Sequence, residues 1–291
     1  MKARENEILK STINHVRKLL GNRLDEITIT RAVFGLFFSG VKLSTGQGGL
    51  CFTPIKEIPE AVCCPSSAKA MPLSGRLKER KATEYLNDIF SGNILKKTLG
   101  IATLNALSTL CWEEYSKNGF ITANGQEFEL LKSTDAFDEL KLIPGEKTVV
   151  IGALVPMLKR LIKRKQDFTV LEMDSRTLKG VELEHYAPAT EAEKYIPDAD
   201  LLVITGTTII NDTLEGLLKM AKSKARILVA GPTASMLPDA FFERGVTMLG
   251  GIIVTKPDEV LDIISEAGSG YHFFGKSAER LVIKIKGKNH A

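Results

Sequence analysis

The chain has 291 residues, of which 44% are apolar and 25% are charged, an ordinary balance for a globular protein. Because a single hydrophobic core usually stops growing near ~250–300 residues, this length predicts two domains. The net charge of +4 comes from 39 basic and 35 acidic residues that are scattered along the chain. This mild and dispersed charge argues against nucleic acid as a partner.

The sequence indicates neither a membrane protein nor a secreted one. No segment approaches the ~20 consecutive apolar residues of a membrane span, and the first residues lack the apolar core of a signal peptide. We therefore expect a cytoplasmic protein whose four cysteines are reduced. They form no Cys-x-x-Cys pair, which argues against a structural zinc site. The adjacent Cys63 and Cys64 could bind a soft metal or be buried as small apolar side chains.

The first part of the chain is predicted to be a small α+β domain. Apolar residues at helical spacing and β-branched runs indicate its elements. These are helices at 4–20, 76–90 and 93–117, an antiparallel meander at 27–53 with a flexible glycine-rich turn at 44–49, and a loop or short hairpin at 119–125. A short helix and linker at 135–143 follow and end at a Pro-Gly turn, so we place the boundary near residue 134, giving domains 1–133 and 134–291.

Beyond the linker, short and continuously apolar runs indicate strands that are buried on both faces. The predicted strands lie at 148–151, 168–171, 201–204, 226–230 and 246–249, and the predicted helices at 157–165, 192–195, 213–221, 239–244 and 257–267. This alternation is typical of an α/β fold with a doubly wound parallel sheet. The stretch 281–286 is compatible with a strand or with the end of a helix.

Ligands of open parallel sheets bind beyond the carboxyl ends of the strands. The first such end carries Gly152, and Pro156 suits the first turn of the next helix. The pattern Gly-x-Gly-x-x-Gly is absent, which argues against NAD as a cofactor. A plain structural turn and the wall of another ligand site both remain open.

The second strand end carries Glu172. An acid in this position often holds a ribose in nucleotide-binding folds. It could equally ligate a metal, hold a basic group, or be a solvated loop residue.

The third strand end is the most informative, because it offers hydroxyls, an amide and backbone N–H groups that open a helix. Its candidate residues are Gly206, Thr207, Thr208, Asn211 and Thr213. Such an end favours anions or polar oxygens, and helix capping explains one of these residues rather than four. The fourth end, Gly231-Pro232-Thr233, has a glycine that lets a ligand approach the backbone.

Asn105 lies in the middle of an apolar helix, either as a satisfied core amide or as a site residue. The four histidines have no metal-ligand spacing and lie near no serine elbow. Metalloprotease and serine-hydrolase chemistry therefore have no support.

The stretches 206–215, 231–233 and 242–251 together closely resemble the prokaryotic "putative heavy-metal chelation" proteins, first catalogued as a domain of unknown function. The resemblance covers most of the chain, including 40–53 and Leu104-Asn105-Ala106. It implies a first domain similar to the enolase N-terminal domain, a Rossmann-like second domain and a site in the cleft between them. Two departures are Thr233, where serine is more common in the family, and Val155, where an aromatic residue is common.

We therefore expect the protein to bind a small anionic or metal-chelating ligand. The sequence does not identify a cofactor, and a metal ion or a metal chelate is one option that stays open. The expected ligand groups of the second domain are the side chains of Thr207, Thr208, Asn211 and Thr213, the backbone of Gly206 and Gly231 with the adjoining Gly152, Pro232 and Thr233, and the carboxylate of Glu172. The first domain is expected to close the cleft with Asn105, Gly48, Gly49 and Thr53. If the protein is an enzyme, Glu172 is the best acid–base candidate.

Two other interpretations stay open. A nucleotide- or S-adenosylmethionine-dependent enzyme would place Glu172 on the ribose. A non-catalytic carrier module fits the lack of a recognisable nucleophile or base. A homodimer is compatible with the sequence, but no sequence signature predicts one.

Overall fold

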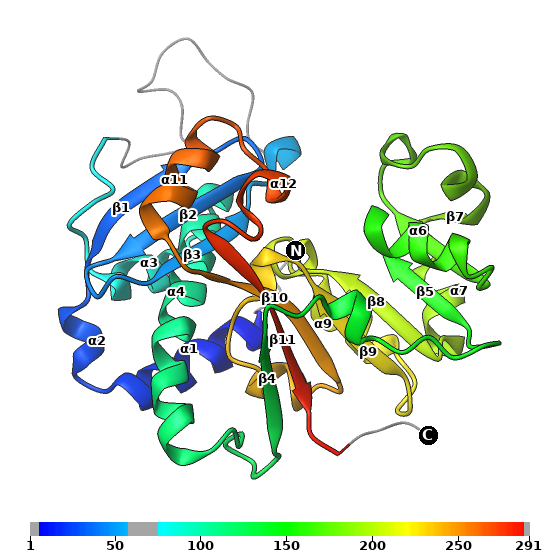
Figure 1. Ribbon diagram of the computed structural model, residues 1–291, viewed down its shortest axis with the longest axis horizontal. Helices are drawn as coiled ribbons and strands as arrows, with labels where there is room; N and C mark the ends of the chain where they lie inside the picture. The colour runs from blue at the N-terminus through cyan, green and yellow to red at the C-terminus, as the bar shows by residue number, and fades with distance from the viewer. Residues whose placement is uncertain (1–5, 58–74, 288–291) are drawn as a thin grey trace.

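The computed structural model of the protein describes residues 6–57 and 75–287 (Figure 1). The Cys63–Cys64 pair lies outside these ranges. Within them, no helix has both the length and the apolar character needed to cross a bilayer.

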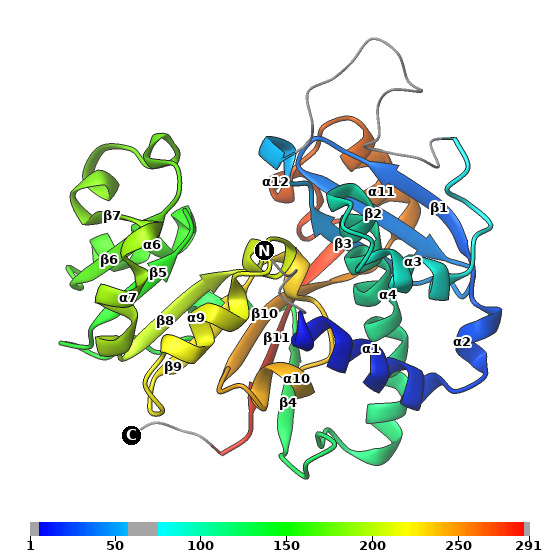
Figure 2. The same cartoon turned by 180° about the vertical axis from the view of Figure 1, so that it is seen from behind.

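The first part of the chain is an antiparallel meander covered by helices, as predicted. Its elements are helices α1 (Glu7–Leu20), α2 (Arg23–Glu26), α3 (Ala82–Asp88) and α4 (Ile94–Asn118), strands β1 (Ile29–Phe34), β2 (Phe38–Leu43) and β3 (Gly48–Phe52), and the 3-10 helix η1 (Ile55–Glu57). Helix α4 packs across β2 and β3, and α1 lies against α4 (Figure 2). The helix predicted at 76–90 is shorter, because Glu79 and Arg80 pair through their backbones with Ile29 instead of entering the helix.

The second part contains six parallel strands in the order β7-β6-β5-β8-β9-β10. Numbered along the chain, this is the order 3-2-1-4-5-6 of Rossmann folds. The strands are β5 (Thr148–Ile151), β6 (Phe168–Glu172), β7 (Tyr186–Pro188), β8 (Leu201–Thr205), β9 (Arg226–Ala230) and β10 (Met248–Val254). The predicted α/β class with a doubly wound, Rossmann-like sheet is confirmed, whereas the likeness of the first part to enolase stays a prediction.

Helices cover both faces of the parallel sheet. The helices of this part are α6 (Val155–Lys163), α7 (Ala192–Tyr195), α8 (Thr207–Ile210), α9 (Leu214–Met220), α10 (Asp239–Phe242), α11 (Pro257–Ser265) and α12 (Gly270–Phe273), of which α11 and α12 lie over the meander instead. Val149 and Val150 join different hydrophobic clusters because successive strand side chains point to opposite faces. Residues of α6 complete one cluster and residues of α9 complete the other.

Strand β10 connects the parallel sheet to the meander. It pairs with β11 (Ala278–Ile285), which pairs with β4 (Phe128–Lys132), and its last residue, Val254, pairs with Gly48 of β3. The stretch 281–286 is therefore a strand over nearly all its length. Helix α11 then packs on β1 and β2, while α5 (Ala136–Glu139) packs on β10 and β11. Elements from both sides of residue 134 share one sheet, so the sheet does not mark a domain boundary there. The predicted boundary stays a prediction.

A buried ion pair joins the linker to the parallel sheet. The Arg226 guanidinium at the start of β9 donates to both carboxylate oxygens of Glu146, at 2.5–2.9 Å, and to the carbonyl of Lys141 at 2.8 Å. Both charged residues are less than a tenth exposed, at 9% and 8%. The pair therefore fixes residues 141–146 against the first residue of β9.

We predict that Arg226→Met lowers the free energy of unfolding by about 3–5 kcal/mol, because the Glu146 carboxylate is left buried without its charged partner. Urea denaturation measures this loss. The double variant Arg226→Met/Glu146→Gln removes the stranded charge and should recover part of the stability. Equal losses in the single and double variants would contradict the coupling.

Candidate functional site

The carboxyl ends of β5 and β8 lie side by side, where the strand order reverses. Gly152 follows β5 with φ +89°, and a Cβ atom there would lie 2.6 Å from the side chain of Thr205 at the end of β8. Gly206 likewise lies against Thr233, whose Cβ would be 3.3 Å from an added Cβ. The predicted strand-end residues therefore come together, and the glycines make the close approach possible.

The backbone N–H groups of Gly206 and Gly231 are already used. They donate to the carbonyls of Ala230 at 2.7 Å and Gly250 at 2.8 Å. These two glycines therefore provide room at the strand ends, while the hydrogen bonds expected of them go to neighbouring strands.

The Glu172 carboxylate forms hydrogen bonds with the turn after β5 and with the residues that follow β6. It accepts from the backbone N–H groups of Ala153 at 2.8 Å, Met173 at 2.7 Å and Asp174 at 3.1 Å. These three bonds orient the carboxylate and hold the ends of β5 and β6 together. Its acid–base role stays a prediction.

Asp174 connects the end of β6 to the meander. Its carboxylate forms ion pairs with Arg176 at 2.8 Å and with Lys56 of η1. These hydrogen bonds, first that of Arg176 and then that of Lys56, hold the pKa of Asp174 well below its usual range. The Lys56 contact brings the residues after β3 to the same edge of the sheet.

The polar residues after β8 bond mainly to one another. The Thr208 hydroxyl donates to the carbonyl of Thr205 at 2.7 Å, and the Asn211 amide oxygen accepts from the Thr213 hydroxyl at 2.7 Å. Thr207 is half-buried, and among the described residues its hydroxyl and backbone N–H make only long contacts, of 3.3 and 3.4 Å, to the Thr205 hydroxyl. Among these residues, Thr207 has the most capacity left for a ligand.

A buried lysine next to this turn was missed by the sequence reasoning. Lys97 of α4 is 8% exposed, and its Nζ lies 2.6 Å from the Asp212 carboxylate. Asp212 also accepts from the Asn6 side chain at 2.9 Å and has φ +58°. The available signal was a lysine eight residues before Asn105 in the same helix, which places both near one face.

Asn105 joins α4 to two other elements. Its Nδ2 donates to the carbonyls of Leu50 in β3 at 2.8 Å and of Pro232 and Thr233 in η6 (Pro232–Ala234) at 3.2 and 3.1 Å. Its Oδ1 is buried and accepts no hydrogen bond from the described residues. The residue is 1% exposed, so it is a core amide that also adjoins the predicted site.

Thr233 contacts the meander as well. Its hydroxyl accepts from the backbone N–H of Phe52 at 3.0 Å. The neighbouring Cys51 is fully buried, and burial raises the pKa of its thiol against the opposing effects of Thr233 and Lys97. The thiol therefore stays protonated at neutral pH.

The remaining candidates of the first part have packing roles. A Cβ on Gly49 would lie 2.1 Å from the carbonyl of Ala102, and one on Gly48 would lie 2.7 Å from Val254. Glycine thus lets α4 and β10 approach β3. The Thr53 hydroxyl is buried and bonds to Gly35 at 2.9 Å.

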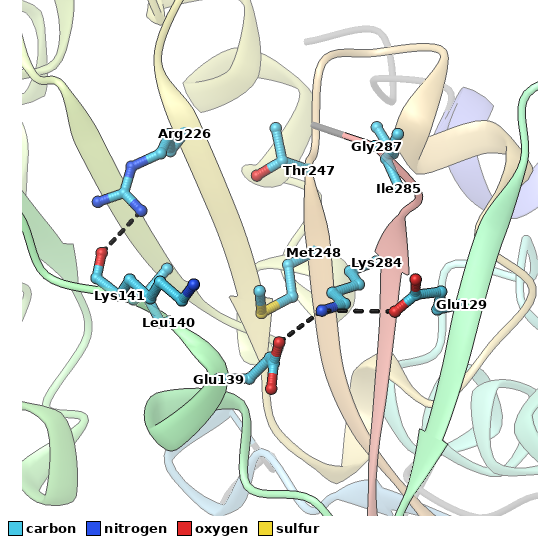
Figure 3. A pocket seen from close by; sticks show the side chains of 10 residues that line it. All are labelled: Glu129, Glu139, Leu140, Lys141, Arg226, Thr247, Met248, Lys284, Ile285 and Gly287. Atoms are coloured by element: carbon cyan, nitrogen blue, oxygen red, sulfur yellow. Dashed lines mark hydrogen bonds and ion pairs between the residues drawn. The ribbon is translucent and has the colours of Figure 1, made fainter. Parts of the chain in front are cut away.

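A hollow of about 180 Å³ lies at the opposite ends of β9 and β10 (Figure 3). Its lining comprises Glu129, Glu139, Leu140, Lys141, Arg226, Thr247, Met248, Lys284, Ile285 and Gly287. Lys284 lies 2.5 Å from Glu139 and 3.4 Å from Glu129, which raise the pKa of Lys284. Lys284 and Arg226 already have carboxylate partners, so neither offers a free charge to a ligand. The ion pairs of Lys284 instead connect β11 to β4 and α5.

The fold and the polar strand ends define an α/β protein with a Rossmann-ordered sheet and a helix-covered meander. Two family models, each described as "Putative heavy-metal chelation", match residues 17–108 and 135–283. The second match alone spans more than half of the chain. The protein therefore belongs to the DUF364 family, which confirms the resemblance; the description of both models points to ligand binding.

Similar proteins come from archaea and bacteria. An uncharacterized protein of Methanocaldococcus jannaschii is 31% identical over 199 residues, which cover 67% of this chain and 68% of the relative. A DUF364-family structure of unknown function from Pyrococcus horikoshii has a TM-score of 0.72 at 20% identity, with 96% of this chain and 100% of that chain covered. Another, from Desulfitobacterium hafniense, has a TM-score of 0.66 at 18% identity, with 94% and 98% covered. These two structures share the fold.

We predict that Asn105→Ala lowers the free energy of unfolding by about 1–3 kcal/mol, because the carbonyl groups of Leu50, Pro232 and Thr233 lose their donor. Urea denaturation measures the change. The matched control is Asn118→Ala, at the exposed end of the same helix, which should stay within about 0.5 kcal/mol of the wild type. A loss in Asn105→Ala no larger than that of the control would show that the amide does not join these elements.

Proposed function

We propose that the protein binds a small anionic metal chelate in a cleft between the carboxyl ends of its parallel strands and the α4–β3 part of the chain. The observation that carries the proposal is the gathering of strand-end hydroxyls and amides beside a buried lysine, Lys97. Hydroxyl, amide and ammonium groups donate hydrogen bonds to oxygen anions. The family description supports a metal as the centre of the ligand.

The two parts of the chain would hold the ligand together. Thr207, Thr208, Asn211 and Thr213 are proposed as ligand groups after β8, with Thr207 the most available. Gly152 and Gly231, both with positive φ, leave space for close approach to the backbone. The contacts of Lys56 with Asp174 and of Asn105 with η6 support an arrangement in which both parts reach the same ligand.

A nucleotide- or S-adenosylmethionine-dependent enzyme is the rival. It is favoured by the strand order and by Glu172, which follows the second strand of that order, where ribose-binding acids lie. It is disfavoured by the single glycine after β5 and by the three backbone hydrogen bonds that already occupy Glu172. A non-catalytic carrier module, the third interpretation, would bind its ligand at the same site without catalysing a reaction.

Thermal-shift measurements separate these functions. We predict that Ni²⁺, Co²⁺ or Zn²⁺ supplied with citrate stabilises the protein more than the metal alone, citrate alone, AMP, NAD or S-adenosylmethionine. At 100 times Kd, binding stabilises by about 2.7 kcal/mol, and each 1 kcal/mol raises Tm by about 2–4 °C in a chain of this size class.

The variant Thr207→Val should reduce the shift, whereas Thr30→Val, on the exposed side of β1, should leave it unchanged. Stabilisation by adenosine compounds that disappears in Glu172→Ala, with no response to chelates, would replace this proposal with its rival.

A further inference from the structure

Lys97 and Asp212 form an ion pair with unused hydrogen-bonding capacity on both sides. An ammonium group has three N–H donors, and among the described residues the Lys97 Nζ contacts one acceptor, Asp212 Oδ1, at 2.6 Å. The Asn6 side chain donates to that same Oδ1, at 2.9 Å. Asp212 Oδ2 accepts from no described residue in any of these contacts. Lysines are almost never this buried without a partner, and here the partner uses only one donor.

The ion pair belongs to the candidate site by its position. Asp212 lies between Asn211 and Thr213, in the turn that joins α8 to α9 after strand β8. The backbone of Asp212 is in the left-handed region at φ +58°, which non-glycine residues rarely adopt. The contacts with Lys97 and Asn6 hold this turn, so α1 and α4 both fix the residues proposed to bind the ligand.

A second unpaired group lies on the same helix. The Asn105 Oδ1 is buried and without a donor among the described residues, and Asn105 Nδ2 reaches η6 after β9. Helix α8 in turn packs against η6. Helix α4 therefore brings spare donors on Lys97 and a spare acceptor on Asn105 to two neighbouring strand ends.

We propose that the Lys97–Asp212 pair recognises an amino-carboxylate, the Lys97 ammonium binding a carboxylate and Asp212 Oδ2 accepting from an adjacent N–H. The pair presents a cation that donates hydrogen bonds beside an anion that accepts them. It therefore complements a ligand in which a carboxylate lies beside an N–H group. A ligand with carboxylates alone would use Lys97 but leave Asp212 Oδ2 without a donor, so it would bind more weakly, and one with amines alone would be repelled by Lys97. This inference rests on the proposed function and narrows it to chelators of the aminopolycarboxylate class.

The test compares Ni²⁺ chelates that differ by one group, using isothermal titration calorimetry with the full chain. Iminodiacetate has two carboxylates and an N–H, N-methyliminodiacetate replaces the N–H by a methyl group, and diethylenetriamine has N–H groups without carboxylates. We expect the wild type to bind Ni²⁺–iminodiacetate at least about tenfold more tightly than either of the others, the effect of one hydrogen bond to a charged group.

Variants of Asp212 and Lys97 show which side chain binds which group of the ligand. Asp212→Asn keeps the shape and tolerates the left-handed backbone, so the protein should fold while its preference for iminodiacetate over N-methyliminodiacetate disappears. Lys97→Met should weaken both carboxylate chelates about tenfold or more and should strengthen the binding of diethylenetriamine, because the repelling charge is removed, whereas Lys97→Arg keeps the charge and should retain carboxylate binding. If Lys97→Met does not fold, the comparisons with Asp212→Asn and Lys97→Arg still test the amino-carboxylate inference.

Different failures overturn different claims. If Ni²⁺–citrate binds but the wild type does not distinguish iminodiacetate from N-methyliminodiacetate, the amino-carboxylate inference is wrong and the proposed function stands. An unchanged preference in Asp212→Asn also overturns the inference. If no metal chelate binds, the proposed function fails, and the inference fails with it.

Discussion

Helix α4 is joined to the rest of the chain by polar side chains along one face, and the position of the candidate site depends on these contacts. Lys97 pairs with Asp212, Asn105 donates to η6, and Ser108 accepts from the backbone of Leu237 at 3.2 Å. Tyr115 donates to Asp239 at 2.8 Å, and burial followed by the Asp239 charge raises the pKa of Tyr115. Apolar packing alone allows a helix to shift, whereas buried polar groups must meet particular partners. These bonds therefore set where the first part of the chain meets the ends of β8 and β9.

The parts of the fold that depend on local pattern could be predicted from the sequence. Strands β5, β6, β8 and β9 are largely continuous apolar runs, and such runs are readable without knowledge of their partners. Strand β10 is predicted at 246–249 but spans Met248–Val254, because Gly250 and Gly251 interrupt its apolar run. Strand β7 has three residues, and β4 is half-exposed and pairs with β11 about 150 residues later, so neither had a readable pattern. The turn at 44–49 illustrates the limit, because Gly48 and Gly49 belong to a strand that needs glycine for the approach of α4 and β10.

The strand-end residues could be predicted as a group, but their bonding could not. The sequence predicts that Glu172 and Asn105 adjoin a site, since a strand end and an amide in an apolar helix are local features. It does not show that Glu172 accepts three backbone N–H groups or that Asn105 reaches β3 and η6, because those partners lie far along the chain. Lys97 was missed for the same reason: a helical lysine is usually solvated, and Asp212, which keeps it buried, lies 115 residues away.

What defines the site is the bonding capacity that the fold leaves unused. Thr208, Asn211, Thr213 and the N–H groups of the strand-end glycines already have partners within the described residues, so they have less capacity left for a ligand than Thr207 has. Among the described residues at these strand ends, capacity is left on the Thr207 hydroxyl, the Asn105 Oδ1 and the two members of the Lys97–Asp212 pair. Of these, the Asn105 Oδ1 is buried without a partner among the described residues, and such a group destabilises the folded chain. We propose that a ligand completes the hydrogen bonds of these groups at the two adjoining strand ends. Such a ligand must offer both an acceptor to the lysine and a donor to the carboxylate, which is a stricter requirement than negative charge alone.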